Sequence, residues 1–270
     1  MRPLGIGRIG LVVATLVGVG LGALRAAPGP ELQRGLENMR ALLDAPRPSR
    51  KKQAGPSEFY FTRAVYSSGY RWSRWATDFP KADRQFMLAV NSLIDIDGNE
   101  HENPVRLDDP NLRRFPFLYA LEVGDMYLSA AEVQGLRGYL LAGGFLVIDD
   151  FWGTWEWSTF EQQIRQVLPE YPIVEMPLDH PIFNSVYRIE EIIQVPAINN
   201  YWNGRTWEQD GVVPHARGIF DDQGRLMVII NWNTDLGDAW EWFERPEYPL
   251  EYSSFAVQLG VNFIAYTMSH

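Results

Sequence analysis

The sequence predicts an α/β fold with a mainly parallel sheet and a C-terminal β-hairpin embellishment. Two short apolar runs, FLYAL (117–121) and FLVI (145–148), are typical of strands that are buried on both faces. A helical pattern follows each run, and two successive strand–helix units require parallel strands joined by right-handed crossovers. In the last third of the chain, a hairpin pattern and an apolar helix complete the domain.

The first elements follow from local periodicity. Residues 59–65 (FYFTRAV) alternate aromatic and polar side chains, which indicates a strand. Apolar residues at helical spacing predict a helix over 81–94. After the first buried run, Ser129 and Glu132 have the spacing of a capping box, and the helix that they open is expected to end at the glycine pair 143–144.

The later elements are predicted in the same way. Ser158 and Glu161 repeat the capping-box spacing, which predicts a helix over 160–168. Residues 217–231 read as two strands joined by the turn DDQG, whose glycine suits the left-handed conformation of a hairpin. A final apolar helix is expected over 253–268.

The N-terminal residues differ from this domain in composition. Residues 1–26 read as a signal peptide, because Arg2 and Arg8 precede an apolar, glycine-rich run. That run is about long enough to span a bilayer, so an uncleaved N-terminal anchor is the alternative. Residues 27–57 combine an amphipathic helix with a basic, Pro-rich linker. We therefore expect residues 58–270 to be a single α/β domain that is exported to the periplasm or the cell exterior, with the N-terminal segment as its only membrane attachment.

The composition excludes several classes of function. The 270 residues carry a formal net charge of −10 and contain no cysteine. Disulfides, zinc–thiolate sites, iron–sulfur clusters and cysteine nucleophiles are therefore excluded. From Glu58 onward there are 15 Lys and Arg residues against 31 Asp and Glu residues, so the domain is more acidic than the whole chain. An acidic domain is not expected to bind nucleic acid, which attracts a basic surface.

An ordered set of segments resembles the DUF4159 family. The segments are FPFLYALEVGDMYLSAAEVQGLRGYLLAGGFLVIDD, LDHPIF, GRLMVIIN, NTDLGDAWE and LGVNFIAYTM, and the resemblance covers nearly all of residues 58–270. That family is similar to the class I glutamine-amidotransferase-like and ThuA-like superfamily. The resemblance implies a flavodoxin-like, three-layer α/β/α core and a bacterial, often exported protein, but it implies no particular reaction.

The sequence departs from that superfamily at its reactive group. Amidotransferases of the superfamily place a cysteine nucleophile in a tight turn between a strand and a helix, with histidine as the base. This chain has no cysteine, and no G-x-S-x-G turn replaces it. The resemblance therefore does not extend to acyl transfer.

Polar residues are expected at the edge of the sheet where the parallel strands end, because open parallel sheets bind ligands there. Glu122 follows the first buried run, and Asp149 and Asp150 follow the second. His180 lies in LDHPIF, and Asp235 comes just after the hairpin. These five are candidate ligand-binding residues, and Asp149, His180 and Asp235 are also candidate catalytic residues. Carboxylates and an imidazole suit acid–base chemistry on a sugar or the binding of a divalent metal.

Each of these residues also has a structural interpretation. An aspartate at a strand end commonly caps a helix or shapes a loop, which applies to Asp150 and Asp235. His180 precedes a proline and suits a hydrogen bond within a turn. No H-x-x-H or D-x-D-x-D-G spacing occurs, so the sequence predicts no cofactor. A divalent metal held by these carboxylates is the alternative.

Three tryptophan-containing stretches, FWGTWEW (151–157), WNGRTW (202–207) and NWNTDLGDAWEW (231–242), have loop composition. Binding residues concentrate in such loops, and aromatic faces suit stacking on sugar rings or holding an aromatic peptide anchor. Trp152 and Trp240 are therefore predicted to line a ligand pocket. The alternative is that the large aromatic side chains cover the edge of the sheet.

Three functions are compatible with these observations. The first, which we prefer, is a non-catalytic ligand-binding or accessory module for a carbohydrate or a peptide. The second is a hydrolase or lyase that uses Asp149 and His180 on a carbohydrate or another cell-envelope substrate. The third is a structural subunit that binds an envelope protein. The fold alone does not choose among them.

Overall fold

The computed structural model describes residues 59–69, 74–99 and 101–270. The predictions for the signal peptide, the amphipathic helix and the basic linker lie outside the described residues. Among the helices that the structure describes, none combines the length and the apolar character needed to cross a bilayer.

A seven-stranded sheet forms the centre of the domain, in the order β2-β1-β3-β4-β7-β6-β5. Its strands are β1 (Thr62–Val65), β2 (Asn103–Arg106), β3 (Phe117–Leu121), β4 (Phe145–Asp149), β5 (Ile173–Glu175), β6 (His215–Phe220) and β7 (Leu226–Trp232). Strands β2, β1, β3, β4 and β7 run parallel, and β6 is antiparallel to both of its neighbours. The mainly parallel sheet is thus confirmed. The hairpin β6–β7 is an integral part of this sheet, because β7 pairs with β4.

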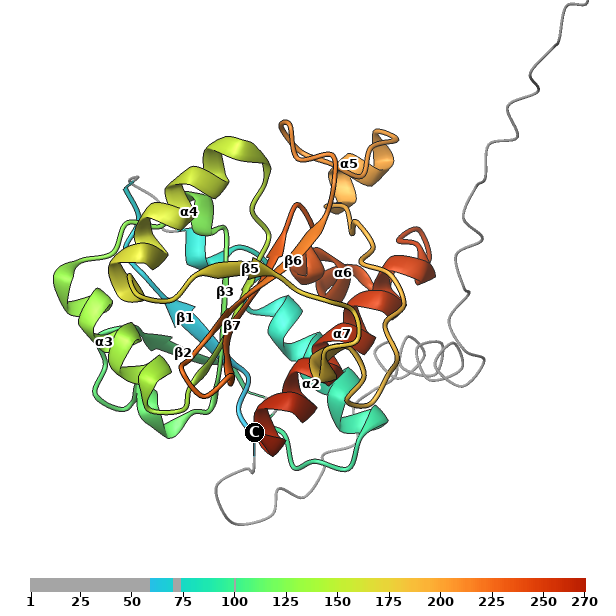
Figure 1. Ribbon diagram of the computed structural model, residues 1–270. Coiled ribbons are helices and arrows are strands. Elements are labelled where there is room, and N and C mark those ends of the chain that lie inside the picture. Colours follow the sequence, from blue (N-terminus) through green and yellow to red (C-terminus); the bar gives the residue numbers. More distant parts are fainter. Residues whose placement is uncertain (1–58, 70–73, 100) are drawn as a thin grey trace, which may run out of the picture.

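Helices cover both faces of the sheet (Figure 1). On one face lie α2 (Lys81–Leu93), α6 (Leu236–Trp242) and α7 (Leu250–Ser269), and on the other lie α3 (Ala130–Leu141) and α4 (Gly153–Val167). The short helix α5 (Ile198–Trp202) projects at the end of the sheet where α4 begins. This arrangement is the expected flavodoxin-like three-layer fold.

The central strands are apolar because they are buried on both sides. All five residues of β3 are buried. Phe117, Tyr119 and Leu121 belong to the core beneath α2, α6 and α7, whereas Leu118 and Ala120 belong to the core beneath α3 and α4. The alternation of side chains along a strand therefore divides FLYAL between two cores.

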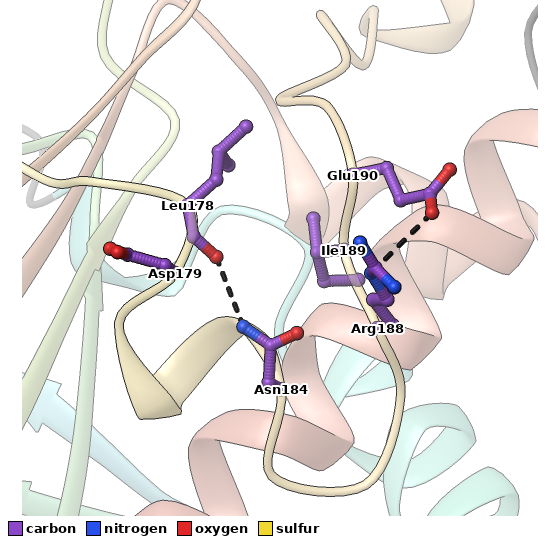
Figure 2. Close-up of a pocket in the computed structure, with 6 residues that line it drawn as sticks. All are labelled: Leu178, Asp179, Asn184, Arg188, Ile189 and Glu190. Carbon is purple, nitrogen blue, oxygen red and sulfur yellow. Dashed lines mark hydrogen bonds and ion pairs between the residues drawn. The ribbon is translucent and has the colours of Figure 1, made fainter.

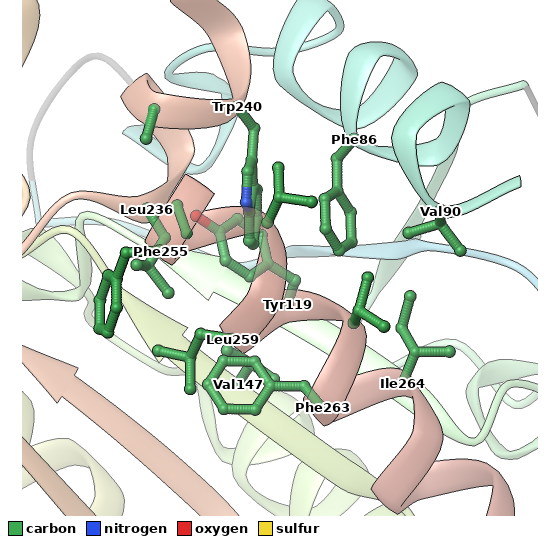
Figure 3. Packing of buried hydrophobic residues seen from close by; sticks show 14 of the residues in the cluster. Phe86, Val90, Tyr119, Val147, Leu236, Trp240, Phe255, Leu259, Phe263 and Ile264 are labelled. Carbon is green, nitrogen blue, oxygen red and sulfur yellow. The ribbon is translucent and has the colours of Figure 1, made fainter. Parts of the chain in front are cut away.

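Trp240 occupies the centre of the larger core (Figure 3). Its ring stacks on Phe86 of α2 with the ring centroids 4.2 Å apart and meets Phe61 edge-on at 6.0 Å. Only 1% of Trp240 is exposed. The prediction that Trp240 lines a ligand pocket is therefore wrong, because α6 is a helix whose buried face packs on α2 and α7.

The capping box that opens α3 is confirmed. The backbone N–H of Glu132 donates to Ser129 Oγ, and Glu132 Oε2 accepts from the backbone N–H of Ser129 at 2.8 Å. Glu132 Oε1 also accepts from the backbone N–H of Ser67 at 2.8 Å. The box thus ties the start of α3 to the segment that follows β1.

Ser129→Ala is expected to lower the free energy of unfolding by about 1 kcal/mol, because an N-terminal N–H of α3 loses its acceptor. Urea unfolding monitored by circular dichroism measures this change. Ser158→Ala is the matched control, since Ser158 is also an exposed serine but lies inside α4, and alanine favours a helix interior. Equal destabilisation by both substitutions would contradict the capping role.

The start of α4 was predicted wrongly. The helix begins at Gly153, so the predicted capping box at Ser158 and Glu161 does not form. Instead, the backbone N–H of Gly153 donates to Asn233 Oδ1 at 2.8 Å, and that of Thr154 donates to Asp210 Oδ1 at 2.9 Å. These acceptors come from distant parts of the chain, so no local pattern reveals them.

Candidate functional site

Four buried aspartates meet a half-buried fifth where the parallel strands end. Asp149 ends β4, Asp150 follows it, and Asp235 and Asp238 lie at the start of α6, directly after β7. Asp78, which was not predicted, joins them from the turn before α2. We call these five residues the acidic site. One carboxylate oxygen from each of Asp78, Asp150 and Asp235 lies within 4.8 Å of the others.

Asp149 anchors α6 to the sheet. Its Oδ2 accepts hydrogen bonds from the Tyr119 hydroxyl at 2.6 Å and from the backbone N–H groups of Leu236 and Gly237 at 2.9 and 3.0 Å. The residue is fully buried, and burial raises the pKa of its carboxyl to about 7. Three donors on one oxygen stabilise the carboxylate form and fix the position of α6.

Asp150 is held in an unusual backbone conformation, with a φ of 46°. Its backbone N–H donates to the Thr234 carbonyl oxygen, and its own carbonyl oxygen accepts from Glu122. Its Oδ1 accepts from the indole N–H of Trp152 at 3.0 Å. Left-handed conformations of non-glycine residues are costly and gather at functional sites, and here the surrounding hydrogen bonds hold the side chain in place.

Asp235 has the capping role that was one interpretation of the sequence, and Asp238 lies in the first turn of the same helix. Asp235 is the N-cap residue of α6, and its Oδ1 accepts from the backbone N–H of Asp238 at 2.7 Å. The Asp238 carboxylate accepts from the backbone N–H of Ile198 at 2.5 Å and from the indole N–H of Trp242 at 3.1 Å. These bonds connect α6 to the start of α5.

The acidic site concentrates negative charge away from water. The pKa values of Asp78, Asp150 and Asp235 all rise well above that of a free aspartate, first because of burial and then because of the neighbouring carboxylates. Such a group of carboxylates either retains protons or attracts a cation.

Glu122 lies at the same edge but is engaged elsewhere. It has a φ of 54°, and its carboxylate forms an ion pair with Arg74. Trp152 is 2% exposed, so it supports Asp150 from within and does not present its face to solvent, in contrast to the predicted pocket-lining role. The FWGTWEW stretch lies mostly in α4 rather than in a loop.

His180 does not join the acidic site. It precedes the short 3-10 helix η4 (Pro181–Phe183), where its Nδ1 accepts from the backbone N–H of Ile182. Its ring lies 5.6 Å from Phe220 and 5.8 Å from Tyr266, beside the hairpin turn that begins β7. Because Asp149 lies at the other end of the parallel strands, the expected pairing of Asp149 with His180 is wrong.

Other tryptophans are exposed near the acidic site. Trp155 in α4, Trp202 in α5 and Trp207 in the following loop are 56%, 59% and 36% exposed. All three lie in stretches that the sequence marks as tryptophan-containing loops, but the sequence did not single out any of them as a site residue.

Hydrogen bonds join the segments that carry these tryptophans. Thr154, beside Trp155, donates through its hydroxyl to Asp210 at 2.7 Å. Asn200 of α5 donates to Glu208 at 2.6 Å, and Glu208 in turn acts electrostatically on Asp150. The start of α4, the loop after α5 and α5 itself therefore form one connected surface beside the acidic site.

The family model described as "Domain of unknown function (DUF4159)" matches residues 61–268. The chain belongs to the DUF4159 family. The match covers all seven strands of the sheet and the whole acidic site. No curated protein matches the chain.

A separate pocket of this DUF4159 domain adjoins the His180 segment and does not include the acidic site (Figure 2). It has a volume of about 510 Å³ and is lined by Leu178, Asp179, Asn184, Arg188, Ile189 and Glu190. Inside it, Asn184 donates to the Leu178 carbonyl oxygen at 3.0 Å, and Arg188 pairs with Glu190 at 3.4 Å. Its charged side chains are exposed, and Arg188 and Glu190 pair with each other, so the pocket lacks the convergent polar groups of a specific site.

Proposed function

We propose that this DUF4159 domain is an exported, non-catalytic binding module whose ligand is a carbohydrate of the cell envelope. The observation that carries the proposal is that Trp155, Trp202 and Trp207 are exposed on segments that hydrogen-bond to one another beside the acidic site. Export is inferred from residues 1–26, which have the composition of a signal peptide.

The chemistry of this surface suits sugars. Exposed indole rings provide flat apolar faces for sugar rings. The carboxylates of Glu208 and Asp210, on the segment that follows Trp207, are acceptors for hydroxyl groups. A peptide ligand is a weaker fit, because the parallel sheet ends here in loops and helix termini and presents no strand edge for backbone pairing.

The position of the candidate catalytic residues favours binding over hydrolysis. Asp149 uses one oxygen to anchor α6, and His180 lies at the opposite end of the sheet. General acid–base catalysis requires the two groups to reach the same substrate atoms. The mainly parallel sheet with helices on both faces supports a relationship to the amidotransferase-like superfamily. This chain has no cysteine, so it lacks the thiol nucleophile of those enzymes.

Isothermal titration of the full chain with chito-oligosaccharides and soluble peptidoglycan fragments tests the proposal. Binding heat is expected with at least one of them, and Trp155→Ala and Trp207→Ala are each expected to weaken binding by about 1 kcal/mol, or several-fold. Leu141→Ala is the control, since Leu141 is an exposed apolar residue at the end of α3, on the other edge of the sheet. Absence of heat with every sugar, or equal weakening by Leu141→Ala, would contradict the proposal.

A further inference from the structure

We propose that the acidic site binds one hard divalent cation, with Asp78, Asp150 and Asp235 as its protein ligands. Their three oxygen atoms lie within 4.8 Å of one another. Two oxygens bound to the same Ca²⁺ at about 2.4 Å are at most about 4.8 Å apart, so a single ion reaches all three. This inference goes beyond carbohydrate binding and does not depend on it.

The surrounding hydrogen bonds orient two of the three ligands. Asp150 Oδ1 accepts from the Trp152 indole, and Asp235 Oδ1 accepts from the backbone N–H of Asp238. Each carboxylate thus has one oxygen fixed by the protein, and its second oxygen is available to an ion. Outer hydrogen bonds of this kind determine the orientation of ligands in metal sites.

Two buried oxygens at this site have no hydrogen-bond partner. They are Asp78 Oδ2 and Asp149 Oδ1, and Asp149 is fully buried. A Cβ atom on Gly237, whose N–H binds the Asp149 carboxylate, would lie 2.7 Å from Asp78 Oδ2. Glycine at position 237 therefore lets the Asp78 carboxylate approach the same backbone segment that binds Asp149, which a side chain there would prevent. Leaving such buried polar atoms without a partner is costly, and a bound cation with its water ligands removes this cost.

The three proposed ligands lack ion-pair partners within the part of the chain that the structure describes. Among the residues that the structure describes, neither Asp78, Asp150 nor Asp235 forms an ion pair. The positive charge of Arg63 acts on Asp78, but Arg63 forms its ion pair with Asp83, and Lys81 pairs with Glu244 at 2.8 Å. Buried carboxylates without ion-pair partners are an environment in which bound cations are found.

The ligand set indicates the kind of ion. All three ligands are carboxylate oxygens, with no imidazole among them, and this chain has no thiolate to offer. Oxygen-only sites bind Ca²⁺, Mg²⁺ and Mn²⁺, whereas Zn²⁺ and Cu²⁺ favour sites with nitrogen or sulfur.

Titration of the chelator-treated full chain with MnCl2 tests the site. Free Mn²⁺ is followed by electron paramagnetic resonance, and heats with CaCl2 and MgCl2 are measured in parallel. We expect one Mn²⁺ per chain, displaced by Ca²⁺ or Mg²⁺, and a rise in Tm on binding. Asp150→Asn and Asp235→Asn are each expected to weaken Mn²⁺ binding at least tenfold. Asp222→Asn, which removes one exposed negative charge in the hairpin turn that begins β7, at the other end of the parallel strands, is the matched control and is expected to bind as the wild type does.

Folding of the variants is checked without added cation. Asp150→Asn and Asp235→Asn reduce the repulsion among buried carboxylates, so their Tm in chelator is expected to equal or exceed that of the wild type. Loss of Mn²⁺ binding by these folded variants supports the site. Absence of Mn²⁺ binding by the wild type, or full binding by both variants, would overturn it. Trp155→Ala is expected to retain Mn²⁺ binding, so failure of the carbohydrate proposal leaves the cation site intact.

Discussion

Replacing Asp83 with alanine is expected to destabilise the domain by about 3–5 kcal/mol, because the Arg63 guanidinium would stay buried without its counter-charge. Arg63 is fully buried, and its Nε donates to Asp83 Oδ2 at 3.3 Å. The guanidinium also donates to the Thr77 carbonyl oxygen and lies 4.9 Å from the Tyr119 ring centroid. The pair thus connects β1 to α2 and to the turn that carries Asp78.

Urea unfolding measures this effect through the midpoint and the m-value. The double variant Arg63→Met/Asp83→Leu is expected to lose much less stability than Asp83→Ala, because apolar side chains then fill the space without an unpaired charge. Asp108→Ala is the control at the surface pair of Arg106 and Asp108, and little change is expected there because solvent screens that pair. A loss in the double variant as large as that in Asp83→Ala would show that the pair itself supplies the stability.

The elements that could be predicted are those that local chemistry determines. The apolar runs of β3 and β4 and the capping box of α3 each lie within a few residues, and all three are confirmed. The start of α4 was missed because its cap acceptors, Asn233 and Asp210, are 80 and 56 residues away from their donors. Contacts over such separations depend on the assembled sheet, which no local pattern encodes.

The candidate site also has residues that could be predicted from the sequence and residues that could not. The rule that parallel strands end at one edge brought Asp149, Asp150 and Asp235 together correctly. Asp78 was missed because it precedes a helix, and its place at this edge depends on the pairing of β1 beside β3. His180 was misplaced because the chain turns back after β5, which brings His180 beside Phe220 near the hairpin turn and not to the end where the parallel strands finish.

The stability of the domain in chelator is expected to fall as the pH rises from about 4 to about 7. The pKa of Asp149 is 3.8 for the free side chain and about 7 in the folded domain. Between these values the folded chain holds a proton that the unfolded chain has released, so raising the pH favours unfolding. One such proton corresponds to about 1.4 kcal/mol per pH unit. Asp150 and Asp235, whose pKa values are also raised by burial, add to the slope in the same direction.

Urea midpoints measured from pH 4.5 to pH 8.5 test this dependence. Asp149→Asn keeps an acceptor oxygen for the α6 N–H groups but cannot titrate, so its slope is expected to decrease by about one proton. Burial lowers the pKa of His180, which acts in the opposite sense by removing stability as the pH falls below about 6.5, and His180→Gln separates this contribution. If the free energy of unfolding instead rises steadily from pH 4.5 to pH 7 in both the wild type and His180→Gln, Asp149 is ionised in the folded domain throughout this range. Water would then have to reach the Asp149 carboxylate and remove the effect of burial on its pKa.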